Sequence, residues 1–287
     1  MQEIQNRLHN IKKNKYLLSV SILLVLLVLL NMIAFNQTFC NRYTETVYGI
    51  LADFLGRIMN FFPVAIGELL MYIGAFWVFC TVILSILLIF LRKKKDFLQF
   101  AKFFYKTVFI TFLCALFFYT IHWSIPFRSS LLGENGHFEK QYSIEELRNV
   151  WLYVVENLNK TCEQAPRDKN GLLLFDGKEK TEKEVADAMK KLAGRYKRLS
   201  GYYPTIKPAL CSDVLKWMQI GGYTYPYTME VTYNQYISDL YFPTLYAHES
   251  AHHQGYYQEN EANFLSYLGC AGSDNRILRY SAYHEIY

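Results

Sequence analysis

The protein has 287 residues, of which 52% are hydrophobic and 17% aromatic, and a formal net charge of +5. The apolar residues concentrate before residue 126, whereas charged and turn-forming residues dominate afterwards. Much of the basic excess lies beside the apolar segments, which is typical of membrane topology and excludes a nucleic-acid-binding signature. The sequence therefore predicts two parts, a membrane region over 1–125 and a domain over 126–287.

Three apolar stretches are long enough to cross a bilayer, which takes about 20 apolar residues. They cover residues 16–35, 69–91 and 107–125, and the last is the shortest and contains His122. A cleaved signal peptide is the alternative for the first stretch, but its apolar run is too long for one and no small-residue cleavage site follows. We expect an α-helical anchor of three transmembrane helices in the cytoplasmic membrane.

Basic residues indicate the orientation of the chain, because cytoplasmic loops carry an excess of lysine and arginine. Arg7, Lys12, Lys13 and Lys15 precede the first stretch, and six more basic residues lie between the second and third stretches. Few lie between the first and second. The N-terminus is therefore predicted inside and the C-terminal domain outside the cytoplasm. Four cysteines would then face an oxidising space, and the sequence leaves disulfides and free thiols as alternatives there.

Between the first two spans, residues 46–62 carry apolar side chains at helical spacing. This pattern predicts an amphipathic helix that either lies on the outer leaflet or packs on the external domain. Glu68, at the edge of the second span, is interpreted as an interfacial group.

The external domain is predicted to be α+β. Ser143 with Glu146, and Thr181 with Glu184, form two capping boxes that each open a helical pattern. A short strand is expected at 172–175, between two turn signals.

Residues 203–234 are rich in tyrosine, threonine, valine and proline, a composition that favours strands. After Pro243 the pattern becomes helical to the end of the chain. The candidate metal ligands and the candidate general base lie in this last, helical part.

His248, Glu249 and His252 form an HExxH sequence. Residues four apart lie on one face of a helix, so the two imidazoles can bind one metal ion. Glu249 is then placed as a general base on a metal-bound water, whose pKa the metal lowers from about 16 toward about 7. We expect one zinc ion, the alternative being a surface helix with two solvated histidines.

A catalytic zinc usually has three protein ligands, and Glu259 and Glu261 are the candidates for the third. In one continuous helix Glu259 would lie about 10 Å beyond His252. The helix must therefore stop and turn back, and Gly255 is suited to that stop. The face of Glu259 carries small residues and Asn263, which could hold a ligand through a hydrogen bond. Glu259 is preferred, and Glu261 is the reserve.

Residues 222–232 predict either an ordinary core strand or an edge strand that binds the substrate backbone through Tyr223, Thr224 and Tyr225. Glu230 is either a cleft carboxylate or, with preference, a solvated edge charge.

A tetrahedral intermediate needs a hydrogen-bond donor near its oxyanion. Tyr280, Tyr283 and His284 follow the third-ligand helix and are candidates for that donor. His253 is interpreted as structural, because it points about 100° away from its ligand neighbour around the helix.

The HESAH sequence followed by ENEAN, residues 259–263, resembles zincins whose third ligand opens an ExxA(D/N) stretch. Membrane peptidases of the CAAX-protease and heat-shock HtpX kind and ImmA/IrrE-type peptidases use such a stretch. The whole layout resembles an uncharacterised bacterial membrane family described as zinc-peptidase-like. That layout has three spans, a Gly-Gly-aromatic segment ending in Pro-Tyr-Thr-x-Glu, and then HExxHHQG and ExEANFLxYL.

This resemblance covers nearly the full chain and implies His248, His252 and Glu259 as ligands with Glu249 as the general base. The connection from His252 to Glu259 is shorter than in the better-known gluzincins. The expected function is hydrolysis of peptide bonds at the outer membrane face, with a peptide or protein substrate, the bilayer and no nucleic acid as partners. The alternatives are a non-catalytic zinc-binding sensor or scaffold and a cell-wall peptide hydrolase.

Overall fold

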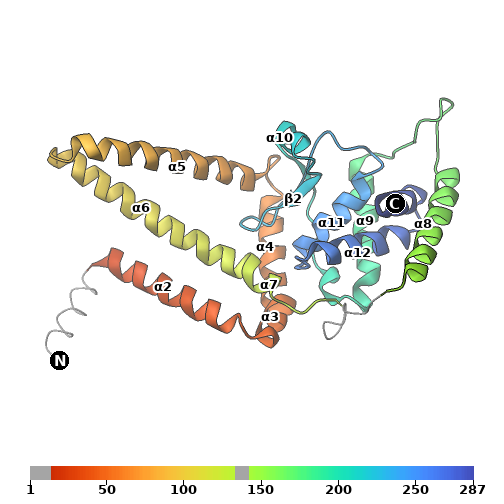
Figure 1. Cartoon of the computed structure of the whole chain (residues 1–287), viewed down its shortest axis with the longest axis horizontal. Coiled ribbons are helices and arrows are strands. Elements are labelled where there is room, and N and C mark those ends of the chain that lie inside the picture. The colour runs from red at the N-terminus through yellow and green to blue at the C-terminus, as the bar shows by residue number, and fades with distance from the viewer. Residues whose placement is uncertain (1–13, 133–141) are drawn as a thin grey trace.

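The structure, a computed structural model, describes residues 14–132 and 142–287. Three helical runs are long and apolar enough to cross a membrane, namely α2 (Lys15–Ile33), α5 (Ile66–Leu91) and Lys95–Phe127. They extend to one side of the molecule, and the C-terminal residues gather beyond the opposite ends of these helices (Figure 1). We call the part formed by residues 142–287 the C-terminal body.

The helix that carries the third apolar stretch begins before that stretch, at Lys95. Helix α6 (Lys95–Tyr119) continues through a π-helical turn, η2 (Thr120–Ser124), into α7 (Ile125–Phe127). Lys102 and Lys106 therefore lie on helix α6 and not in a loop. Of the basic residues before the first span, Arg7, Lys12 and Lys13 lie outside the described residues.

A helical segment between the first two spans crosses the ends of these spans (Figure 1). It comprises α3 (Gln37–Tyr43), the π-helix η1 (Thr44–Tyr48) and α4 (Gly49–Met59). Tyr48 and Ala52 are buried in one cluster with Tyr257 of the C-terminal body, which supports the packing alternative. On its other face Ile50 and Phe54 are 71% and 61% exposed, so an apolar stripe remains uncovered.

The C-terminal body is mostly helical and contains one small sheet. Its helices are α8 (Ile144–Gln164), α9 (Lys178–Lys191), α10 (Ser212–Trp217), α11 (Phe242–His253), α12 (Glu259–Ala271) and α13 (Arg276–Ile286), with 3-10 turns η4 (Leu192–Gly194) and η5 (Lys197–Ser200). Its strands are β1 (Lys207–Pro208), β2 (Gly222–Thr224) and β3 (Val231–Tyr233).

The strands are ordered β1-β3-β2, with β1 parallel and β2 antiparallel to β3, so β2 is an edge strand of this sheet. Strands were expected within 203–234, and these three confirm them. The strand predicted at 172–175 is wrong, because Leu173 forms only an isolated bridge with Arg167.

The capping box at Ser143 is confirmed: its hydroxyl accepts from the Glu146 N–H at 3.1 Å, and Glu146 accepts from the Ser143 N–H at 2.8 Å. The box at Thr181 is wrong, because α9 starts three residues earlier, after Gly177. Thr181 thus lies inside the helix and donates to the Gly177 carbonyl at 2.9 Å.

Helix α11 lies at the centre of the body. Every residue of α11 except His248 is buried. Phe242 and Tyr246 of this helix pack in one core with Met189 of α9 and Leu265 of α12. All six cysteines fall within the described ranges and are free thiols.

Buried charges join the second span to the body. Glu230 accepts hydrogen bonds from Lys207 Nζ at 2.6 Å and from the Ile66 and Gly67 N–H groups at 3.0 and 2.7 Å. Both expectations for Glu230, cleft carboxylate and solvated charge, are therefore wrong. Its buried position follows from the pairing with Lys207, which offsets the cost of removing a carboxylate from water.

Glu68 is fully buried as well, and it accepts from the Leu210 and Cys211 N–H groups at 2.7 and 2.6 Å. The interpretation of Glu68 as an interfacial group missed this role. We refer to Glu68, Lys207 and Glu230 as the anchor cluster.

Candidate metal centre

Helix α11 is built to end where the sequence predicts. Pro243 lies in its first turn, where the missing N–H costs nothing. At its other end Gly255 has φ +89°, a conformation that favours glycine, and the Tyr256 N–H donates to the Ala251 carbonyl at 3.0 Å. The chain then reverses, and α12 begins at Glu259. The predicted stop and return are both confirmed.

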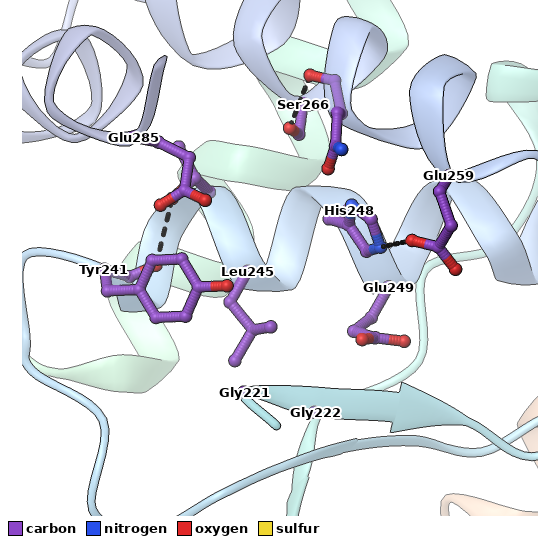
Figure 2. A pocket seen from close by; sticks show the side chains of 11 residues that line it. Gly221, Gly222, Tyr241, Leu245, His248, Glu249, Glu259, Ser266 and Glu285 are labelled. Atoms are coloured by element: carbon purple, nitrogen blue, oxygen red, sulfur yellow. Dashed lines mark hydrogen bonds and ion pairs between the residues drawn. The ribbon is translucent and has the colours of Figure 1, made fainter. Parts of the chain in front are cut away.

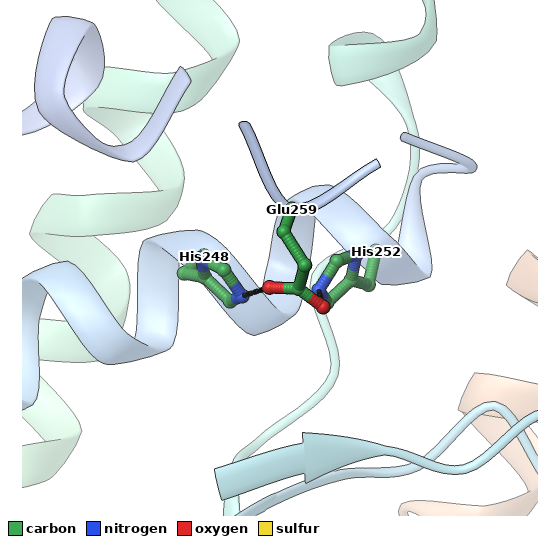
Figure 3. A group of neighbouring side chains, drawn as sticks. All are labelled: His248, His252 and Glu259. Carbon is green, nitrogen blue, oxygen red and sulfur yellow. Dashed lines mark ion pairs between the residues drawn. The ribbon is translucent and has the colours of Figure 1, made fainter. Parts of the chain in front are cut away.

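The reversal brings three side chains together, as Figure 3 shows. Glu259 Oε2 lies 3.2 Å from His248 Nε2, and Glu259 Oε1 lies 3.5 Å from His252 Nε2. All three potential ligand atoms lie within 4.8 Å of one another. A tetrahedral zinc with bonds of about 2.0–2.2 Å separates its ligand atoms by roughly 3.4 Å. The three residues therefore fit one metal ion.

The orientation of His252 is fixed from behind. Its Nδ1 lies 2.8 Å from the Tyr256 carbonyl, so this nitrogen donates and Nε2 keeps its lone pair for the cleft. Burial alone would lower the pKa of His252, but the neighbouring Glu259 and Glu249 carboxylates reverse the shift and raise it. Hydrogen bonds with His248 and then His252 hold the pKa of Glu259 far below its usual range.

Glu249 points from α11 toward strand β2 (Figure 2). Its side chain is buried, and Thr224 Oγ1 donates to Glu249 Oε2 at 2.9 Å and to the Glu249 carbonyl at 2.8 Å. A Cβ added to Gly222 would lie 3.4 Å from the other carboxylate oxygen, Oε1. Burial raises the pKa of Glu249, and the nearby His248 and His252 oppose that rise.

A cavity of about 220 Å³ opens beside these residues. It is lined by Gly221, Gly222, Tyr241, Thr244, Leu245, His248, Glu249, Glu259, Asn263, Ser266 and Glu285 (Figure 2). Sequence reasoning missed Tyr241 and Glu285. Tyr241 precedes His248 by seven residues, two helical turns on the same face, and that spacing could have found it. No comparable signal marks Glu285 at the end of α13.

Strand β2 borders the cavity through Gly222, with Gly221 just before it. The Asn234 N–H donates to the Gly221 carbonyl at 2.7 Å, and the Tyr225 N–H donates to the Glu230 carbonyl at 2.8 Å. Since backbone direction alternates in an antiparallel pair, the N–H and C=O groups of Gly222 and Thr224 point away from β3. The position of β2 at the edge of the sheet is thus confirmed, and the binding of a substrate backbone through Tyr223, Thr224 and Tyr225 stays a prediction.

The chain matches, over residues 43–287, the family described as Protein of unknown function (DUF3810). The chain belongs to this family. No curated protein and no solved structure matches the chain. The match to the DUF3810 family starts at Tyr43, directly before η1, so it includes η1 and α4, which pack on the body, as well as His248, His252 and Glu259.

Within this DUF3810 chain, the two predicted ligand glutamates have different surroundings. Glu261 turns away from the histidines and accepts from the Leu132 N–H at 2.5 Å, which supports the preference for Glu259. Asn263 lines the cavity, but among the described residues its side chain has no hydrogen bond to a ligand residue. The predicted support of a ligand by Asn263 is therefore absent in this part of the chain.

The predicted oxyanion donors do not line the cavity among the described residues. Tyr283 Oη lies 3.2 Å from Tyr153 Oη of α8, because α13 packs that face against α8. Tyr280 is directed at Cys162 on the same side, and His284 is exposed. The prediction is corrected for all three residues.

His253 is structural, as predicted. Its Nδ1 lies 2.9 Å from the Met229 carbonyl, and its ring is fully buried. The ring faces α4, where a Cβ on Gly56 would lie 2.9 Å from His253 Cε1. His253 thus belongs to the contact between the body and the helical segment before the second span.

Proposed function

We propose that this protein is a membrane-anchored zinc metallopeptidase that hydrolyses peptide bonds outside the cytoplasm. The observation that supports it best is the convergence of His248, His252 and Glu259 beside a buried Glu249 at an open cavity. Structural zinc sites are closed by four protein ligands, whereas catalytic sites have three and one open position. Glu259 remains 76% exposed, which is consistent with an open site.

Bound by these three side chains, zinc would supply Lewis-acid activation of a water molecule and of the substrate carbonyl. Glu249 then takes a proton from the water and returns it to the leaving amine. Thr224 holds one oxygen of this carboxylate, so the other is directed at the cleft. A positioned general base of this kind contributes about 10²- to 10⁴-fold to the rate.

Two further groups are suited to the substrate. The free backbone groups of Gly222 and Thr224 would pair with an extended peptide, which gives affinity without demanding one side-chain sequence. Tyr241 is the tyrosine among the described cavity-lining residues, and burial raises its pKa to about 12. Its hydroxyl therefore stays protonated and is proposed to donate to the carbonyl oxygen of the substrate.

The proposed location outside the cytoplasm is supported by charge. The short connection between α5 and α6 carries Arg92, Lys93 and Lys94, followed by Lys95 at the start of α6. This connection lies at the ends of the spans that point away from the body (Figure 1). A basic loop favours the cytoplasmic side, so the body is proposed to lie on the opposite side.

The test uses the full-length protein in detergent, with zinc content and cleavage of a peptide library measured together. Glu249→Gln should keep about one zinc per chain and lose at least about 10²-fold in cleavage rate. Glu261→Gln is the matched control, because this carboxylate turns away from the cleft and should leave the rate unchanged. Equal activity of Glu249→Gln and wild type would refute the proposal.

Other outcomes separate the alternatives. Bound zinc with no cleavage of any peptide would favour a sensor or scaffold. Cleavage restricted to cell-wall muropeptides would favour a cell-wall hydrolase with the same metal chemistry.

A further inference from the structure

The turn between β2 and β3 reaches the ends of two spans. The Tyr225 ring lies directly on Gly67 in the first turn of α5, where there is no room for a Cβ. The carbonyl of Pro226 lies 3.0 Å from His122 Nδ1 in η2, which continues α6. In Figure 1 this turn extends from β2 to the region between the ends of α5 and α6. The β2–β3 hairpin thus points its tip at the membrane boundary.

The surface beside this hairpin is also suited to a bilayer. Val214, Trp217 and Met218 share one face of α10 and its end, and they are 53%, 85% and 54% exposed. The residues just before α10 are held to the first turn of α5 by Glu68, which accepts from the Leu210 N–H. An exposed tryptophan with apolar neighbours at the end of a span is typical of the membrane interface.

The catalytic carboxylate lies close to that boundary. Thr224 binds Glu249, and Pro226, only two residues later, contacts the end of the third span. At about 3.3 Å per residue in a strand, this interval is roughly 7 Å. A polypeptide paired with the free edge of β2 therefore has one end directed at the bilayer and the other at the cavity of Tyr241 and Glu285.

We infer that the substrates are membrane-tethered polypeptides, bound as an added strand on β2 and cut within roughly six residues of their own membrane segment. This inference rests on the proposed peptidase function and names its substrate class. The reaction is amide hydrolysis: the C–N bond breaks, the water oxygen joins the carbonyl carbon, and a proton passes to the leaving amine. Tethering both partners in one bilayer raises the effective concentration of the substrate at the β2 edge.

The experiment places the full-length protein in liposomes with a reporter library. Each reporter has an apolar helix of about 20 residues followed by a randomised segment of about 24 residues, roughly 80 Å when extended. Cleavage sites are mapped by mass spectrometry as distances from the helix. A second library carries the same randomised segments without the helix, and Glu249→Gln is the blank for both.

The expected result is that cuts cluster within about six residues of the helix and that the untethered library is cut at least about tenfold more slowly. Tethering alone would accelerate every position, so the cluster is the decisive readout. Cuts spread evenly over the segment, with Glu249→Gln inactive, would overturn this inference and leave the peptidase function standing. Cleavage of neither library above the blank would overturn both.

Discussion

The anchor cluster and the candidate metal centre each place a glutamate carboxylate beside nitrogen atoms, but with different surroundings. In the anchor cluster, Glu230 is surrounded by donors from the protein: Lys207 Nζ and two backbone N–H groups. In the candidate metal centre, Glu259 lies 3.2 and 3.5 Å from the His248 and His252 nitrogens. A buried carboxylate surrounded by donors from its own chain stabilises the fold, whereas an exposed one beside two imidazoles at an open cavity is suited to bind a cation.

The largest expected effect would come from breaking the anchor cluster. Glu230→Gln leaves Lys207 as a buried charge without a counterion, which should cost about 3–5 kcal/mol in the free energy of unfolding. Denaturant unfolding of the purified protein in detergent measures this loss. The matched control is Glu259→Gln without metal, expected within about 0.5 kcal/mol of wild type because that side chain is largely exposed. Equal losses in the two variants would contradict the distinction between the regions.

The second prediction concerns metal binding. Glu259→Ala should weaken zinc binding by about 100-fold, or about 2.7 kcal/mol, because it removes one of the three proposed ligands. Glu261→Ala should leave zinc affinity unchanged, since Glu261 binds the Leu132 N–H instead. Competition with a zinc-chelating dye gives both affinities. A loss confined to Glu261→Ala would reverse the assignment of the third ligand.

A smaller effect is expected where η1 contacts the end of α11, which carries the candidate metal centre. Tyr48 Oη lies 3.3 and 3.0 Å from the carbonyl oxygens of His252 and His253, at the C-terminal end of α11. Tyr48→Phe removes this buried donor and should cost about 1–3 kcal/mol in unfolding free energy. Tyr236→Phe, at an exposed tyrosine, is the control and should be close to neutral. Thermal melts in detergent that show no difference between the two variants would argue against the link.

The smallest effect concerns Glu182, a partly buried carboxylate on α9. Burial raises the pKa of Glu182 to about 7, with a backbone hydrogen bond to Ile206 opposing the rise. Because the folded state holds the Glu182 proton more tightly than the unfolded state, protonation of Glu182 stabilises the fold. This stabilisation is complete below the usual carboxyl pKa and is lost as the pH rises through about 7.

Glu182→Gln should therefore raise the melting temperature by about 2–4 °C at pH 8 and change it little near pH 4.5. Glu163→Gln, at an exposed position on α8, should show no such pH dependence. A shift for Glu182→Gln that is the same at both pH values would contradict a proton held by Glu182.

The comparison also explains what the sequence could predict. The metal centre depends on local spacing, because His248, His252, the stop at Gly255 and the return to Glu259 lie within twelve consecutive residues. The anchor cluster joins Lys207 and Glu230 to the backbone of Ile66, far away in sequence. Contacts between residues far apart in sequence leave no periodic pattern. The sequence therefore favours a solvated edge for Glu230 and does not reveal its pairing with Lys207.

The cavity lining shows the same division. Tyr241 shares a helical face with His248, so helical periodicity predicts that it lies at the cavity. Glu285 lies on a separate helix, α13, whose packing against α8 decides which of its side chains face the cavity. That packing also turned Tyr280 and Tyr283 away from the position expected for them.

The contact between Tyr48 and the carbonyl end of α11 has a consequence for proteolytic release of the body from the membrane. A protease that cut the chain after α7 would release a fragment without η1 and α4, and the His252 and His253 carbonyls would lose their donor. The same cut would uncover the His253 ring on which Gly56 lies. Shedding would thus remove these contacts from the candidate metal centre, and the proposed hydrolysis would be confined to molecules that still reside in the membrane.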